Sequence, residues 1–206
     1  MNRPLSIAEE DFSLTASRSA NRSTVLVVTL YLLFYFLASF LDHSTTSLAL
    51  QSSGAHEGNV VSSSQGYVST RAWAITVIAA FLLAGCVAFA VRHADRTEEI
   101  WLQHPVRSFG LFYVNPWAGT AMGRSPIHML SFALAFPLLR ILAAVNNLMI
   151  HFYGVAPIGT PIEWIAKRSS PLVGFVVVLV VLFYLLAIAV SPIAARLISS
   201  WRNEPV

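Results

Sequence analysis

The sequence predicts an all-α, polytopic integral membrane protein in which four transmembrane helices form a small bundle with amphipathic segments at the interfaces. Its 206 residues are 56% apolar and only 11% charged, whereas soluble chains carry about 25% charged residues. The apolar residues fall into blocks of about 18 to 25, long enough to cross a hydrocarbon core roughly 30 Å thick. Together with a single cysteine, this composition excludes a disordered chain, a collagen-like repeat and a disulfide-stapled module.

The first half of the chain divides into a tail, two spans and a loop. Residues 1–23 are polar and lack the short apolar run and cleavage site of a signal peptide, so we expect a cytoplasmic tail. Apolar runs predict the first span at about 24–50 and the second at about 72–91. The Ser/Gly-rich stretch 51–70 between them is typical of an exposed loop.

The second half alternates surface segments with two further spans. Residues 92–125 mix charged and aromatic residues and are broken by prolines, which favours a segment lying on the membrane surface. The third span, about 127–153, contains polar residues, whereas the fourth, about 171–192, contains no charge. We interpret 155–164 as a connector broken by Pro and Gly, and 193–206 as a C-terminal amphipathic tail. Residues 24–206 are thus predicted to form one transmembrane domain.

The basic residues predict the orientation. Nine of the thirteen Lys and Arg residues fall in the two termini and the surface segment 92–125, which share one side of the membrane if there are four spans. Arg71, Lys167 and Arg168 fall on the other side. The positive-inside rule therefore places both termini in the cytoplasm. The lone cysteine and the preference for arginine over lysine suit a bacterial inner membrane.

The third predicted span carries an ionisable residue, which costs about 2.5 to 3.5 kcal/mol on insertion scales and usually has a partner. Arg140, Asn147 and His151 follow a helical spacing of i, i+7 and i+11, and therefore form one polar stripe. Pro137 leaves the carbonyl of Ala133 without its helical donor, which favours a kink or a local water site.

The first predicted span ends with Asp42, Thr45 and Thr46 on one helical face. Counting residues from the membrane surface places Asp42 and Arg140 in the same leaflet. We therefore hypothesise an ion pair or water-bridged pair between them, extended by polar neighbours. The alternative is that Asp42 caps its helix at the membrane surface, while the side chain of Arg140 extends to that surface without a partner. The predicted polar intramembrane cluster comprises Asp42, Thr45, Thr46, Arg140, Asn146, Asn147 and His151.

The run LDHSTTSLAL followed by HEGN resembles a family of small bacterial and archaeal membrane proteins of unknown function. In that family an Asp-x-x-Thr-Thr helix end precedes a Glu-x-Asn loop, and a later span holds a basic residue. Here the loop carries His56, Glu57 and Asn59, but Val60 stands where the family commonly has Pro. The resemblance implies a polar motif between spans and no particular activity.

No enzyme motif is present: there is no GxSxG, Walker A or GxGxxG pattern. His43, His56, Glu57 and His151 lack the spacing of metal ligands, so we expect no metal and no cofactor. Cys86, in an apolar run, is expected to be a packing residue.

These observations favour a non-catalytic accessory or scaffolding subunit that docks onto a larger membrane complex, with lipids and another integral membrane protein as partners and no nucleic acid. Small-residue stripes at Ala80, Ala84 and Ala88, and at 187–195, suit close helix packing. The first alternative is a small transporter or channel that uses Asp42, Arg140, Asn147 and His151. A membrane-embedded lipid-processing enzyme is the second alternative.

Overall fold

A computed structural model describes the backbone of residues 7–51, 70–114 and 121–203. Helices and turns account for this part of the chain, and it contains no strand. Four helices are long and apolar enough to cross a membrane, which confirms an all-α multi-pass fold. The long helices are α1 (Ile7–Leu50), α2 (Thr70–Arg92), α5 (Ala121–Tyr153) and α7 (Pro171–Asn203). The short helices are η1 (Ala94–Arg96), α3 (Glu99–Gln103), α4 (Pro105–Val114) and α6 (Gly159–Ala166).

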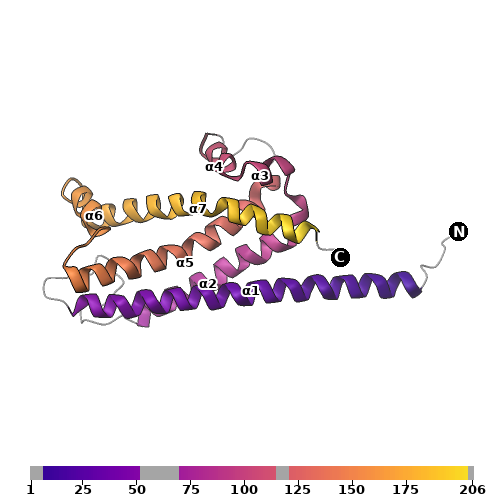
Figure 1. Cartoon of the computed structure of the whole chain (residues 1–206), viewed down its shortest axis with the longest axis horizontal. Helices are drawn as coiled ribbons and strands as arrows, with labels where there is room; N and C mark the ends of the chain where they lie inside the picture. The colour runs from indigo at the N-terminus through magenta and orange to yellow at the C-terminus, as the bar shows by residue number, and fades with distance from the viewer. Residues whose placement is uncertain (1–6, 52–69, 115–120, 204–206) are drawn as a thin grey trace.

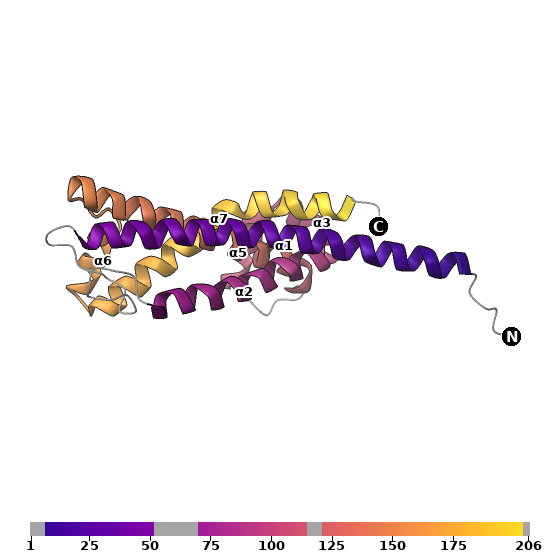
Figure 2. The same ribbon diagram turned by 90° about the horizontal axis from the view of Figure 1, so that it is seen from below.

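Helix α5 is the centre of the bundle. It packs along α1, α2 and α7, while α1 and α2 also pack against each other. The backbones of helices α1 and α7 do not come close to each other, so neither helix lies directly beside the other. Figures 1 and 2 show α1 extending well beyond the other helices, with the N-terminal end of α1 and the C-terminal end of α7 directed toward the same end of the bundle. We call this end the α3 end and the opposite end the α6 end.

Three predicted boundaries differ from the structure. The polar segment 1–23 is helical from Ile7 and continuous with the first span. The connector after the third span contains α6, which folds back onto α7. This approach is close because Gly174 has no side chain: a Cβ there would lie 2.5 Å from the carbonyl oxygen of Ile162. Residues 193–203 continue α7 instead of forming a separate tail.

Helix α7 passes through Pro192 because a neighbouring hydroxyl replaces the missing hydrogen bond. Proline has no N–H, so the carbonyl four residues earlier, that of Ile188, loses its helical donor. The hydroxyl of Ser191 donates to that carbonyl at 2.8 Å. Serine hydroxyls commonly satisfy freed carbonyls in membrane helices. The predicted end of the fourth span at about 192 is therefore not the end of the helix.

Small side chains lie where the helices approach closely. Ala187, Ser191 and Ala195 of α7 are buried, as are Ala80 and Ala84 of α2. Larger apolar side chains fill the space toward the α3 end, where all four long helices contribute to one core. Its least accessible large members are Tyr35, Val87, Ile127, Leu130 and Ile198.

The predicted surface segment 92–125 is anchored to the bundle through α4. The Ser108 hydroxyl donates to the carbonyl of Pro105 at 2.6 Å and lies 3.0 Å from Nε2 of His128 on α5. Because that hydroxyl has one proton, Nε2 is the donor in the second contact. Tyr184 on α7 donates to the carbonyl of Phe109 at 3.3 Å. Helix α4 is thus held between α5 and α7.

Candidate functional site

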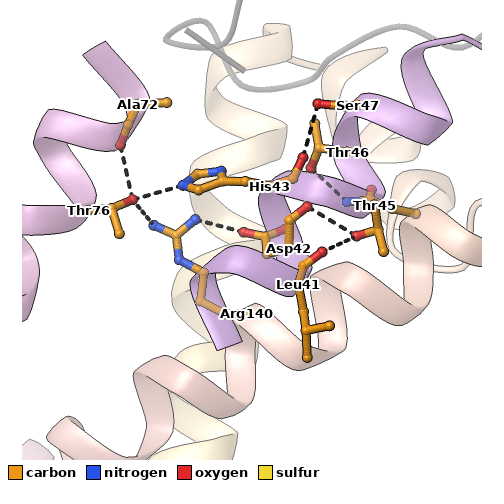
Figure 3. A network of polar contacts seen from close by, with 10 residues as sticks. Leu41, Asp42, His43, Thr45, Thr46, Ser47, Ala72, Thr76 and Arg140 are labelled. Carbon is orange, nitrogen blue, oxygen red and sulfur yellow. Dashed lines mark hydrogen bonds and ion pairs between the residues drawn. The ribbon is translucent and has the colours of Figure 1, made fainter. Parts of the chain in front are cut away.

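The most polar buried site joins Asp42 on α1 to Arg140 on α5. The guanidinium Nη1 of Arg140 donates to Oδ2 of Asp42 at 2.7 Å (Figure 3). The side chains of Asp42 and Arg140 are 11% and 23% exposed. The ion pair expected from the sequence is therefore present as a direct contact. It neutralises both charges within a membrane-spanning part of the chain.

Thr76 on α2 is the third partner. Its hydroxyl accepts from Nη2 of Arg140 at 3.2 Å, lies 3.0 Å from Nε2 of His43, and donates to the carbonyl of Ala72 at 3.0 Å. A hydroxyl has one proton and two acceptor positions. Since the proton is directed to Ala72, Nε2 of His43 must donate, and all three capacities of Thr76 are used. Figure 3 shows the imidazole of His43 and the guanidinium of Arg140 both directed at the hydroxyl of Thr76.

The site therefore connects three helices through four side chains. Asp42 and His43 are consecutive residues of α1, and a helix separates consecutive side chains by about 100°. Asp42 contacts α5 and His43 contacts α2, which is possible because α1 lies beside both. The imidazole of His43 also packs on the indole of Trp73, with ring centroids 4.5 Å apart.

Sequence reasoning did not assign His43 or Thr76 to the cluster. Thr76 did have a signal, because it is the only hydroxyl residue between 73 and 91, a run that is otherwise apolar. A lone hydroxyl in such a span commonly hydrogen-bonds across helices. His43 was considered as a metal ligand together with other histidines. Within the described residues there is no group of three or more His, Cys, Asp or Glu side chains that could hold a metal ion.

Two further polar residues of α5 join it to α1 near the α6 end of the bundle. Nδ2 of Asn147 donates to the hydroxyl of Thr46 at 2.8 Å. Nδ1 of His151 lies 3.1 Å from the carbonyl oxygen of Leu48, and a carbonyl only accepts, so the imidazole donates. Both contacts join α5 to the last turns of α1, which extends the ion pair as expected.

Two predicted residues have other roles. Thr45 donates to carbonyl oxygens of its own helix, at Leu41 and Asp42, and does not reach α5. The side-chain oxygen of Asn146 accepts from the backbone N–H of Ile158 at 2.9 Å, which fixes the connector before α6. The predicted loop motif His56, Glu57 and Asn59 lies outside the described residues.

Two further hydroxyls on α1 lie near the pair without hydrogen-bond partners. The phenol of Tyr35 is beside the guanidinium of Arg140 but does not meet the geometry of a hydrogen bond. The hydroxyl of Ser39, one turn further along α1, is also buried and unpartnered. Both residues are completely inaccessible.

The cluster offers charge neutralisation and helix-to-helix hydrogen bonds, together with two unused hydroxyls. The resemblance to small membrane proteins depends on the short motif in the sequence alone. No protein-family model, no curated protein and no solved structure matches the chain.

Proposed function

We propose that the protein is a non-catalytic accessory or scaffolding subunit that docks onto a larger membrane complex. The bacterial inner membrane is its proposed location, with both termini in the cytoplasm as the positive-inside rule requires. Its proposed partners are membrane lipids and another integral membrane protein. The observation that carries this proposal is the open bundle, in which α1 and α7 pack on α5 while their backbones stay apart from each other.

An open bundle supports docking because a partner helix can reach two helices of this chain at once. Only 22% of the 18-residue apolar stretch of α7 is buried within the chain. Its exposed face is composed of aliphatic residues, including Val177, Val181 and Leu185. Helices in membranes associate through packing and small residues, not through exclusion from lipid. A partner that packs beside α7 therefore gains contacts without displacing any helix of the bundle.

The ion pair supports a structural use of the charged residues. The charges of Arg140 and Asp42 neutralise each other inside the chain, and Thr76 fixes their geometry. An arrangement of this kind holds α1, α2 and α5 in one register. A scaffold needs such a fixed register, since its outer surface must be presented in a constant shape.

The proposal is tested by the mass and composition of the particle in its native membrane. We would extract the protein in mild detergent or nanodiscs, measure the intact mass and identify every associated chain. A photo-crosslinking residue at Leu185 on α7 would be compared with one at Phe81 on α2, both well exposed. A stoichiometric partner crosslinked at Leu185 and not at Phe81 supports docking beside α7. A particle containing this chain and lipid alone, with lipid adducts at both positions, contradicts it.

A small transporter is the second candidate function. The observation that favours it is the pair of unpartnered hydroxyls at Tyr35 and Ser39 beside a partly exposed arginine. Intramembrane ionisable residues often mark pathways for ions or protons. Flux measured in proteoliposomes, with wild-type protein and with Asp42→Asn, would test this candidate directly.

A further inference from the structure

Four exposed arginines lie at the α3 end of the bundle. They are Arg92 at the end of α2, Arg96 in η1, Arg107 in α4 and Arg196 near the end of α7. Helix α7 packs against α2, η1 and α4, so these elements together form one end of the molecule (Figure 1). Within the described residues, none of the four side chains forms an ion pair or a hydrogen bond. We call them the α3-end arginines.

Two of these arginines lie where the exposed apolar face of a span ends. Phe81 is the central residue of the span Thr70–Arg92, and it is 68% exposed. Arg92 follows it by eleven residues, which places both on one face of α2, about 16 Å apart along the axis. Since half of the hydrocarbon core is about 15 Å thick, Arg92 lies at the level of the lipid headgroups. Arg196 follows the exposed Leu185 of α7 at the same spacing.

The positive charge at this end is only partly offset by acidic residues. Glu99 pairs with Arg202 at 3.0 Å, so these two charges neutralise each other. Asp95 and Glu98 are the acidic side chains that have no ion pair among the described residues of this end. The four unpaired arginines therefore exceed the unpaired carboxylates, and the α3 end carries a net positive charge that an anionic partner would neutralise.

The cations at the α6 end are mostly occupied by contacts within the chain. Lys167 pairs with Glu163 at 2.9 Å. Arg168 lies over the indole of Trp164, 3.9 Å from the ring centroid, and donates to the carbonyl oxygen of the same residue at 2.9 Å. Of the described Lys and Arg side chains at this end, only Arg71 is exposed without such a contact. Unpaired positive charge is thus concentrated at the α3 end.

Exposed aliphatic side chains accompany the α3-end arginines. Ile193 and Leu197 are near Arg196 on α7 and are 54% and 37% exposed. Val106, which precedes Arg107 on α4, is 51% exposed. A membrane surface offers phosphate groups to the arginines and hydrocarbon to the aliphatic side chains at the same time. A nucleic acid offers only the first, so this mixture of exposed side chains favours lipid.

We propose that the α3-end arginines bind the phosphate groups of anionic phospholipids at the membrane surface. The planar guanidinium presents donors in a geometry that matches two phosphate oxygens. Each arginine near an anionic membrane surface strengthens binding by about fivefold. This inference rests on the proposed function, which includes membrane lipids as partners, and it names the headgroup and the residues that bind it.

Lipid binding by the purified full-length protein tests the proposal. The protein in detergent would be titrated with phosphatidylglycerol, which is anionic, or with phosphatidylcholine, which is zwitterionic. Native mass spectrometry counts the bound lipids. We expect the wild-type protein to bind phosphatidylglycerol at least about tenfold more tightly than phosphatidylcholine. Arg92→Gln, Arg107→Gln and Arg196→Gln together should remove most of this preference and leave the affinity for phosphatidylcholine unchanged.

A control variant removes the same number of charges from the other end. Arg71→Gln, Lys167→Gln and Arg168→Gln together should lower the affinity for phosphatidylglycerol by less than about threefold, because two of these cations already have partners. Equal losses in the two triple variants would show that the lipid responds to net charge and not to the α3 end, which would overturn the proposal.

Salt provides a measurement that needs no variant. Raising the KCl concentration from about 0.05 M to about 0.5 M should weaken phosphatidylglycerol binding several-fold, because salt screens exposed charges. A wild-type protein without a preference for phosphatidylglycerol, or with a preference that salt does not change, would overturn the proposal. If poly-L-glutamate binds instead and the first triple variant loses it, the α3 end fits an acidic protein and the lipid proposal is wrong. Because the purified protein contains no partner chain, failure here leaves the crosslinking test at Leu185 unaffected.

Discussion

The hydroxyl of Tyr31 on α1 donates to the carbonyl oxygen of Ala133 on α5 at 3.0 Å. This carbonyl is the one that Pro137 leaves without a helical donor, since proline four residues later has no N–H. Sequence reasoning expected a kink or a water at this position, and the structure places a tyrosine from another helix there. The contact links α1 to α5 about two turns from the ion pair.

We expect Tyr31→Phe to lower the free energy of unfolding by about 1 kcal/mol, the usual net value of one hydrogen bond. In a Pro137→Ala background the same substitution should cost close to nothing, because the new backbone N–H can bond to Ala133 instead. A double-mutant cycle measured by thermal unfolding in nanodiscs provides the comparison. Additive effects of the two substitutions would show that the tyrosine does not replace the missing donor.

Breaking the ion pair should cost more than losing a neutral hydrogen bond. Asp42→Asn or Arg140→Gln leaves one buried charge without its partner, which typically destabilises by about 3 kcal/mol. The reversed pair, Asp42→Arg with Arg140→Asp, should recover part of this loss in the yield of folded protein. If the reversed pair is no better than either reversed single variant, the attraction between the two residues is not what stabilises this site.

Thr76→Val should be more harmful than Thr45→Val, although both residues are buried threonines. Thr76 contacts Arg140, His43 and Ala72, so its removal leaves donors on two other helices unsatisfied. Thr45 contacts only carbonyls of its own helix. We expect a loss of about 1 to 3 kcal/mol for Thr76→Val and a smaller loss for Thr45→Val. Equal melting temperatures for the two variants would contradict a bridging role for Thr76.

Gly174 should not tolerate a side chain. A Cβ at this position would lie 2.5 Å from the carbonyl oxygen of Ile162, so α6 would have to move away from α7. Gly174→Ala is expected to destabilise the docking by about 1 to 3 kcal/mol and to speed hydrogen exchange in α6. Gly85→Ala is the control, since a Cβ there meets nothing within 4 Å. That variant should gain up to about 1 kcal/mol from helix propensity.

Helix α6 should show a small dependence on pH. The pKa of Glu163 is lowered, first by its hydrogen bond with Lys167 and then by the lysine charge. A lowered pKa means that folding favours the carboxylate, so the contribution is present above the ordinary pKa of glutamic acid. It is lost as the pH falls through the lowered value. The difference in melting temperature between wild type and Glu163→Gln should therefore shrink in acid. Because both side chains are mostly exposed, added salt should reduce the difference as well.

Much of the fold follows from run length and composition. Four apolar runs long enough to cross a bilayer predicted the four long helices. Residue counting placed Asp42 and Arg140 in the same leaflet, and their ion pair was one of two alternatives. Helix α6 was not predicted, because Pro157, Gly159 and Pro161 normally mark a break and here only surround the start of a short helix. Local sequence does not show that this helix is stabilised by packing on α7.

The bridging role of Thr76 could not be predicted from the sequence for a different reason. A period of 3.6 residues defines the faces of α2 but not which face turns toward α1 and α5. That rotation is set by packing of small residues such as Ala80 and Ala84. The same limit applies to His43, whose direction depends on α2 lying beside α1. Contacts between two residues on facing stripes were predictable, and contacts among three helices were not.

The separation of the ion-pair partners along the chain has a consequence for synthesis. Asp42 and Arg140 are 98 residues apart, and at about 5 to 20 residues per second a ribosome needs roughly 5 to 20 s to make the intervening chain. During that interval α1 and α2 can pair through His43 and Thr76, while the carboxyl group of Asp42 still lacks its arginine. The first helical hairpin is therefore made before its charge is neutralised. Helix α5 then supplies the arginine, and α7, which is made last, completes the bundle by packing on α5.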